Sequence, residues 1–124
     1  MKAEKHQMSE LSPYKRSPAL SNSTWYKGML FSQMAGPADN GGTFDFVVAK
    51  MRPGTEPPPH VHSREDEFFY ILSGKLWVYV DGKVFTVTPG ECVFLPRQRR
   101  HRLQSQTMSV RLLRPRVNWP ASCA

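Results

Sequence analysis

The chain has 124 residues, enough for one domain with a substantial core but not for two independent domains. Its residues are 40% apolar and 11% aromatic, which argues against disorder, and no apolar run approaches the ~18 residues of a membrane span. The formal charge of +7 suggests an anionic partner, but seven arginines after residue 96 carry the whole excess. The two cysteines, Cys92 and Cys123, do not form a disulfide framework, so we expect a reducing, cytoplasmic compartment.

The chain divides into a polar start, a patterned body and a basic end. Residues 1–22 are polar and show no periodicity, so they are predicted to form a flexible N-terminal tail. In residues 23–113, short runs rich in aromatic and β-branched residues alternate with turn residues, which predicts an all-β sandwich or barrel. The expected strands are Trp25–Met34, Thr43–Met51, His60–His62, Glu67–Ser73, Lys75–Val80, Lys83–Thr88, Cys92–Leu95, His101–Gln104 and Met108–Leu113.

Residues 114–124 break this pattern. They contain Pro115 and Pro120 and show no alternation, which argues against a central strand. We therefore expect an irregular, basic C-terminal end after Leu113.

Two of the expected strands are apolar on both faces. In Glu67–Ser73 and Lys75–Val80 the side chains of both parities are largely apolar, although a barrel strand buries only one face. The outer faces need cover, either from the N-terminal segment or from a second subunit. We predict a homodimer.

Three histidines and one glutamate form the candidate site. His60 and His62 are two residues apart, so on a strand their side chains point to the same side. Glu67 begins the next apolar strand, and His101 begins another after the turn at Pro96. Three imidazoles and a carboxylate are a ligand set for one divalent first-row metal (Fe, Mn, Ni, Cu, Co or Zn) that leaves coordination positions open.

The spacing of these residues has a known counterpart. The runs Gly54-x5-His60-x-His62-x4-Glu67-x6-Gly74 and Gly90-x5-Pro96-x4-His101 resemble the two motifs of the cupin superfamily. The chain departs from the second motif at Gln98, where the family usually has Gly. The resemblance is to small single-domain cupins of the conserved-barrel, quercetin dioxygenase-like type, and it implies a double-stranded β-helix (jelly-roll) barrel.

The resemblance also implies the site and its chemistry. It implies His60, His62, Glu67 and His101 as metal ligands, with Glu65 the main rival to Glu67. A dioxygenase-type oxidoreductase acting on a small organic substrate such as a flavonol or enediol is favoured. The resemblance to flavonol-cleaving cupins implies a second, catalytic role of Glu67 as proton acceptor, and the alternative is that Glu67 only ligates the metal. The alternatives are a metal-dependent isomerase or lyase and a non-catalytic cupin that binds a small molecule as a sensor.

Two further groups of residues are open to interpretation. Candidates for the pocket wall are Phe46, Phe69, Ile71, Trp77, Tyr79 and Phe94. Four arginines flank His101, namely Arg97, Arg99, Arg100 and Arg102. Three interpretations are open: the arginines form a solvated loop, they steer an acidic substrate, or they contact nucleic acid. Nucleic acid is the least favoured partner, because the cluster lacks interleaved aromatic residues and a recognition helix.

Overall fold

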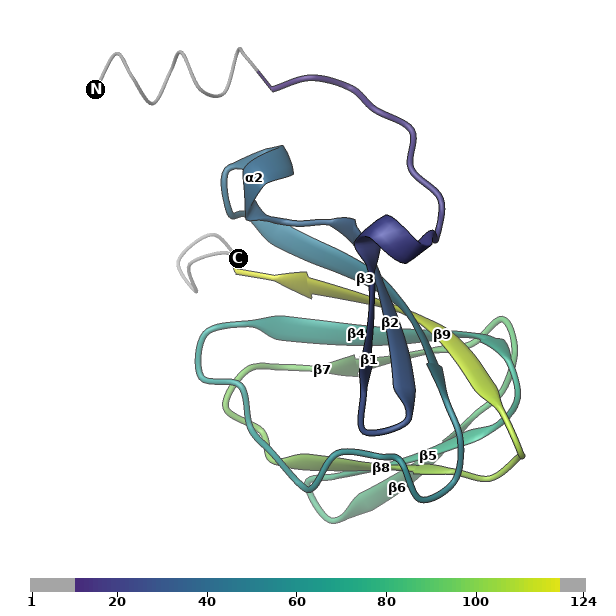
Figure 1. Cartoon of the computed structure of the whole chain (residues 1–124). Coiled ribbons are helices and arrows are strands. Elements are labelled where there is room, and N and C mark those ends of the chain that lie inside the picture. Colours follow the sequence, from purple (N-terminus) through teal and green to yellow (C-terminus); the bar gives the residue numbers. More distant parts are fainter. Residues whose placement is uncertain (1–10, 119–124) are drawn as a thin grey trace.

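The computed structural model describes residues 11–118, which form two antiparallel sheets (Figure 1). The predicted tail and C-terminal end therefore lie partly outside the described residues, and Cys123 and Pro120 lie wholly outside them. The elements are η1 (Leu20–Asn22), β1 (Ser23–Tyr26), β2 (Met29–Ala35), α2 (Pro37–Asn40), β3 (Phe44–Met51), β4 (Asp66–Ser73), β5 (Leu76–Val80), β6 (Lys83–Val87), β7 (Cys92–Leu95), β8 (His101–Ser105) and β9 (Val110–Val117). Within these residues, no helix is long and apolar enough to cross a membrane.

The two sheets enclose the apolar core. In the described part of the chain, the larger sheet has the strand order β1-β2-β3-β9-β4-β7 and the smaller one the order β6-β5-β8. Side chains alternate as a half-buried strand requires: on β5, Leu76 and Val78 are buried whereas Trp77 is only half-buried. Apart from Glu67, the largest side chains that are almost completely buried are Ile71, Leu76, Leu95, Leu112, Val78 and Val110. The predicted all-β fold is confirmed.

Turn residues define two hairpins, one of which the sequence pattern missed. Asp81 and Gly82 both have positive φ, at 52° and 71°, and join β5 to β6 in the tight turn that the Asp-Gly pair indicates. The expected single strand Trp25–Met34 is wrong, because Lys27 and Gly28 also have positive φ and fold it into the β1–β2 hairpin.

The expectation that residues after Leu113 are irregular is also wrong for the residues described. Strand β9 continues to Val117 and lies between β3 and β4. Pro115 pairs with Phe46 on β3, while the pairing with β4 is interrupted between Leu113 and Arg116. The sheet accommodates the proline because its missing N–H falls in this gap.

The segment before β1 lies against β2 and α2. The Tyr14 hydroxyl donates to the Met34 carbonyl at 2.7 Å, and Arg16 forms two hydrogen bonds to the Asp39 carboxylate. The side-chain amide of Asn22 donates to Gln33 O at 3.1 Å. Residues 11–22 are thereby placed along one end of the larger sheet.

Candidate metal centre

His60 and His101 face each other across a backbone bridge. The His60 N–H donates to His101 O at 3.1 Å, and the His101 N–H donates to His60 O at 2.9 Å. The expected strand His60–His62 is therefore reduced to a single bridge beside the start of β8. The bridge nevertheless fixes two of the predicted ligands next to each other, with ring centroids 4.3 Å apart.

His62 and Glu67 are held by the neighbouring turn and strand. The Gln98 N–H donates to His62 O at 2.6 Å, which ties the loop of His62 to the turn before β8. Gln98 has a φ of 67°, in the left-handed region that favours glycine, and this explains why a glycine suits this position. Glu67 is the second residue of β4 and shares the buried face of that strand with Phe69 and Ile71, so its side chain enters the barrel.

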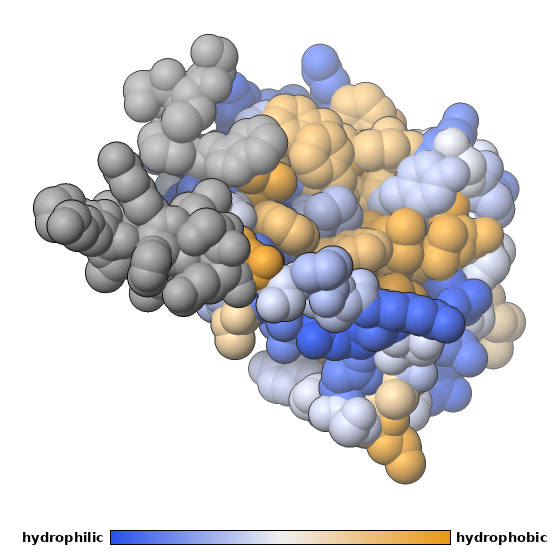
Figure 2. Space-filling model, turned by 90° about the horizontal axis from the view of Figure 1, so that it is seen from above, coloured by the Kyte–Doolittle hydropathy of each residue, from blue (hydrophilic) through white to orange (hydrophobic). Residues whose placement is uncertain are grey.

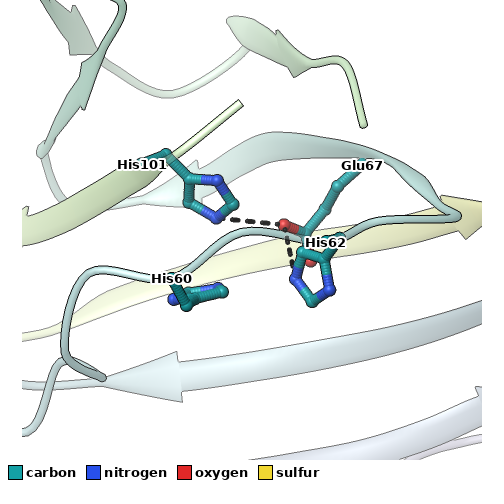
Figure 3. A group of neighbouring side chains, drawn as sticks. All are labelled: His60, His62, Glu67 and His101. Carbon is teal, nitrogen blue, oxygen red and sulfur yellow. Dashed lines mark ion pairs between the residues drawn. The ribbon is translucent and has the colours of Figure 1, made fainter. Parts of the chain in front are cut away.

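The four predicted ligands converge on one point (Figure 3). One ligand atom from each of the four lies within 4.8 Å of the others. Oε1 of Glu67 is 3.6 Å from Nε2 of His62 and 3.4 Å from Nε2 of His101. Glu67 and His101 are only 2% and 3% exposed, whereas His60 and His62 are half-buried at the open side. The rival carboxylate, Glu65, lies outside this group, next to Nδ1 of His62.

Backbone carbonyls orient two of the imidazole rings. Nδ1 of His60 is 3.0 Å from Pro58 O, and Nδ1 of His101 is 3.3 Å from Arg99 O. A carbonyl oxygen only accepts hydrogen bonds, so each neutral ring carries its proton on Nδ1. The lone pair is then on Nε2, the nitrogen that a metal ion would contact.

The buried polar atoms at the centre of the cluster are unsatisfied. Among residues 11–118, Nε2 of His62, Oε1 of Glu67 and Nε2 of His101 are buried without a hydrogen-bond partner. Such orphaned groups are costly and rare in folded proteins. One cation would satisfy all three, so this cluster could bind a metal ion.

The protonation states also suit metal ligation. Burial raises the pKa of the Glu67 carboxyl, but the adjacent His101 ring and the Arg114 charge outweigh burial, and the net pKa is below its ordinary value. Burial lowers the pKa of His62, and the charge of Glu67 offsets this only in part. At neutral pH the site therefore presents a carboxylate and a neutral His62 ring, the forms that bind metals.

Sequence reasoning missed the arginines of β9 that adjoin this site. Arg114 and Arg116 lie on the same face of β9 as buried Leu112, directed toward the barrel interior. Nε of Arg114 is 3.5 Å from Oε2 of Glu67, and Arg116 forms a close ion pair with Asp45 on β3. The sequence signal for their inward direction was that they are two and four residues after Leu112. The change from apolar to charged side chains concealed this alternation.

A small apolar cavity lies beside the cluster. Its volume is about 50 Å³, and His60, Glu67 and Arg114 form its polar side. The rest of its wall consists of Met29, Phe31, Ala49, Met51, Pro57, Phe69, Leu103 and Leu112. Of the predicted wall residues, Phe69 is the one that lines this cavity. Ile71 belongs to the closed core, and Phe94 is 49% exposed on β7.

The arginines around His101 are largely engaged by other side chains. Arg97 forms hydrogen bonds to both carboxylate oxygens of Asp66, and Arg99 pairs with Asp81. The guanidinium of Arg102 stacks 4.1 Å above the centre of the Tyr79 ring. These contacts favour the solvated, ion-paired loop over the other two interpretations.

Comparison with known sequences gives the same family. The profile of the family described as "Cupin domain" matches residues 47–113. The chain is 34% identical over 70 residues to "Polyketide synthase CurC" of Streptomyces cyaneus, covering 56% of this chain and 46% of that protein. It is 30% identical over 71 residues to "Tetracenomycin polyketide synthase protein TcmJ" of Streptomyces glaucescens, covering 56% and 48% respectively. The chain thus spans about half the length of these curated relatives.

Comparison with solved structures supports the fold. The structure of KdgF from Halomonas sp. superposes with a TM-score of 0.69 at 17% sequence identity, over 90% of this chain and 100% of that one. At this identity the likeness concerns the fold alone: two antiparallel sheets in a cupin arrangement.

Proposed function

This chain belongs to the cupin domain family, and we propose that it is a mononuclear metal-dependent oxidoreductase of the dioxygenase type. Its substrate would be a small organic molecule with an ionisable oxygen, such as a flavonol or an enediol. The ligands are His60, His62, Glu67 and His101, and the metal is one divalent first-row ion.

One observation supports this proposal most strongly. The three histidines and Glu67 bring their ligand atoms together beside a cavity, and three of these atoms have no hydrogen-bond partner within the described residues. Four protein ligands leave open positions on a five- or six-coordinate ion, and the cavity lies directly next to them. When bound, the metal would supply a Lewis-acidic position for a substrate oxygen and a place for dioxygen to react. The apolar wall excludes water from that position.

Glu67 is proposed to have two roles through its two oxygens. Oε1 is the oxygen that lies among the imidazoles, which suits it to ligation. Oε2 is directed toward Arg114 and is proposed to accept the proton that the substrate hydroxyl loses. The His101 ring and then the Arg114 charge lower the pKa of Glu67, which makes it a weak base, suited to an acidic enol or phenol rather than to an alcohol.

A second candidate function follows from the named relatives. Two proteins at 30% identity or more are named as polyketide synthase proteins. The chain would then act on an oxygenated polyketide product or intermediate as a metal-dependent isomerase, lyase or binding protein. Because it spans only half of those relatives, this assignment is a proposal for the shared barrel and not for their full activity.

Oxygen uptake distinguishes these functions. Quercetin added to the metal-loaded protein in an oxygen electrode should produce substrate-dependent oxygen consumption. His101→Ala should abolish it, while Glu91→Gln, which changes an exposed carboxylate outside the cluster, should retain it. Substrate loss under anaerobic conditions would instead indicate an isomerase or lyase, and tight binding without turnover would indicate a sensor; both results contradict the dioxygenase.

A further inference from the structure

Arg114 lies between two hollows of the barrel. It lines the cavity of about 50 Å³ beside the histidine cluster, and it also lines a wider groove of about 420 Å³. Phe31 is the other residue that borders both, with its ring centre 5.9 Å from the Arg114 guanidinium. The rest of the groove is lined by Ser21, Asn22, Ser23, Thr24, Gln33 and Val47. A ligand reaching from the groove toward the metal centre would therefore pass Arg114 and Phe31.

The hydrogen-bonding groups of Arg114 are incompletely satisfied, although two carboxylates lie within ion-pairing distance of it. Its Nη2 is 3.6 Å from Asp45, but Asp45 receives shorter contacts from Arg116, the closest at 2.8 Å. Its Nε is 3.5 Å from Oε2 of Glu67, and within the described residues this buried Nε has no hydrogen-bond partner. A guanidinium carries five donors in a planar fork, and it is suited to bind the two oxygens of a carboxylate.

Metal binding would increase the positive charge at this point. Glu67 is the carboxylate nearest to Arg114 Nε and is also a member of the proposed ligand set. A divalent ion on Glu67 would leave Arg114 facing a net positive centre, which favours an anion in the adjoining cavity. The apolar wall formed by Met29, Met51 and Phe69 disfavours a strongly hydrated anion such as phosphate.

We propose that Arg114 is the anchor for the carboxylate of a small organic acid whose planar apolar body lies along Phe31. This inference rests on the proposed function, because it names the substrate class of the same site. The carboxylate pairs with the Arg114 fork at the boundary of the two hollows. The cavity of about 50 Å³ is smaller than an aromatic ring requires, so the apolar body lies in the groove against Phe31 and extends toward Asn22 and Gln33.

Calorimetric titration with benzoate and its uncharged isostere benzamide tests the anchor without measuring turnover. Both ligands are titrated into the wild-type protein, Arg114→Gln and Arg111→Gln, each metal-free and again after loading with Zn²⁺ to equal measured content. Arg111→Gln is the matched control, because Arg111 is exposed on the opposite face of the same strand and lines neither hollow. Arg114→Lys keeps the charge but removes the fork, and near-ultraviolet circular dichroism checks the fold of each variant.

Benzoate should bind the wild-type protein at least ten times more tightly than benzamide. Arg114→Gln should weaken benzoate binding about 10- to 100-fold in both forms, the range expected for a charge-assisted pair, with benzamide unchanged. Arg114→Lys should retain part of the affinity, and Arg111→Gln should change it less than threefold. Equal losses in Arg114→Gln and Arg111→Gln, or equal binding of benzoate and benzamide, would overturn the proposal. Because the metal-free titration is independent of metal content, failure of the metal centre and failure of the anchor are distinguishable.

Discussion

The carboxylate of Glu56 ties the loop that carries His60 to the barrel, in addition to the backbone bridge between His60 and His101. Its Oε2 accepts a hydrogen bond from the Ser105 N–H at 2.7 Å, and its Oε1 accepts one from the Gly54 N–H at 2.8 Å. Burial alone would raise the pKa of Glu56, but these backbone hydrogen bonds outweigh it, and the pKa lies below its ordinary value of 4.5. Both oxygens therefore act as acceptors at neutral pH.

Glu56→Gln tests this contact through its pH dependence. A carboxyl whose pKa is lowered in the folded state contributes stability above its ordinary pKa of 4.5 and loses it as the pH falls through the folded value. The substituted amide keeps one acceptor oxygen only, so the variant should unfold at a lower temperature than the wild-type protein at pH 7. The difference should shrink below pH 4.5 in thermal unfolding followed by circular dichroism. A difference that stays constant as the pH falls from neutral to well below that value would contradict this role.

The members of the histidine–glutamate cluster were predictable from the sequence because each is marked by a strong local signal. His60 and His62 share a parity, Glu67 opens an apolar run, and His101 follows a proline turn. Arg114 was not predictable, because its role depends on Asp45 and Glu67, which come from two other strands. Parity with Leu112 indicates the face that Arg114 occupies, but the side chains that it meets there depend on the pairing register with the neighbouring strands.

At the level of elements, the β4–β5 turn approaches another segment of backbone more closely than any side chain would allow. Gly74 has a φ of 85°, and a Cβ at this position would meet the Ser109 carbonyl oxygen and the Thr107 hydroxyl. Gly90, before β7, has a similar φ of 87°, but a Cβ there would enter open space. A substitution at Gly90 therefore introduces backbone strain alone, whereas one at Gly74 adds steric overlap.

Gly74→Ala should destabilise the protein far more than Gly90→Ala. Left-handed backbone costs an alanine about 1–2 kcal/mol at either position, and displacement of the Ser109 segment adds to this only at Gly74. Denaturant unfolding should thus show a larger loss of unfolding free energy for Gly74→Ala, by ~1 kcal/mol or more. Equal losses of unfolding free energy would contradict this, because they would show that the Ser109 segment moves away from the new Cβ at no cost.

The elements were predicted where local patterning decides them and not where the partner strands do. The run from Lys75 to Thr88 gave its hairpin correctly, because an Asp-Gly turn lies between two alternating strands. The course of residues 114–117 was missed, because Pro115 normally marks an edge strand and its tolerance depends on the local gap in pairing with β4. Such a gap is a property of the sheet and has no signature within the strand itself.

For the whole molecule, exposed apolar side chains remain on the outer face of the larger sheet. Tyr70 and Leu72 on β4 and Phe94 on β7 are each at least 37% exposed, and Phe94 lies 4.9 Å from Phe68 between ring centres. Figure 2 likewise shows apolar residues at the surface on the face seen from above. Within residues 11–118, the side-chain hydrogen bonds of the segment before η1 lead to β2 and α2 rather than to β4.

We propose that the protein is a homodimer. Of the two covers considered for the apolar outer faces, the described part of the N-terminal segment contacts a different region, so a second copy is favoured. Sedimentation equilibrium at micromolar concentration should give twice the chain mass of 14.2 kDa. Phe94→Glu should shift the population toward the monomer if β7 contributes to the interface. A wild-type protein that sediments as a monomer throughout would contradict the proposal.

The most direct test of the central claim is the metal content of the purified protein by inductively coupled plasma mass spectrometry. The wild-type protein should contain one divalent first-row metal ion per chain after loading and dialysis. His62→Ala should contain none, while Glu65→Gln should retain the full content because Glu65 lies outside the convergent cluster. Full metal content in His62→Ala, or none in the wild-type protein, would contradict the assignment of His60, His62, Glu67 and His101 as a metal centre.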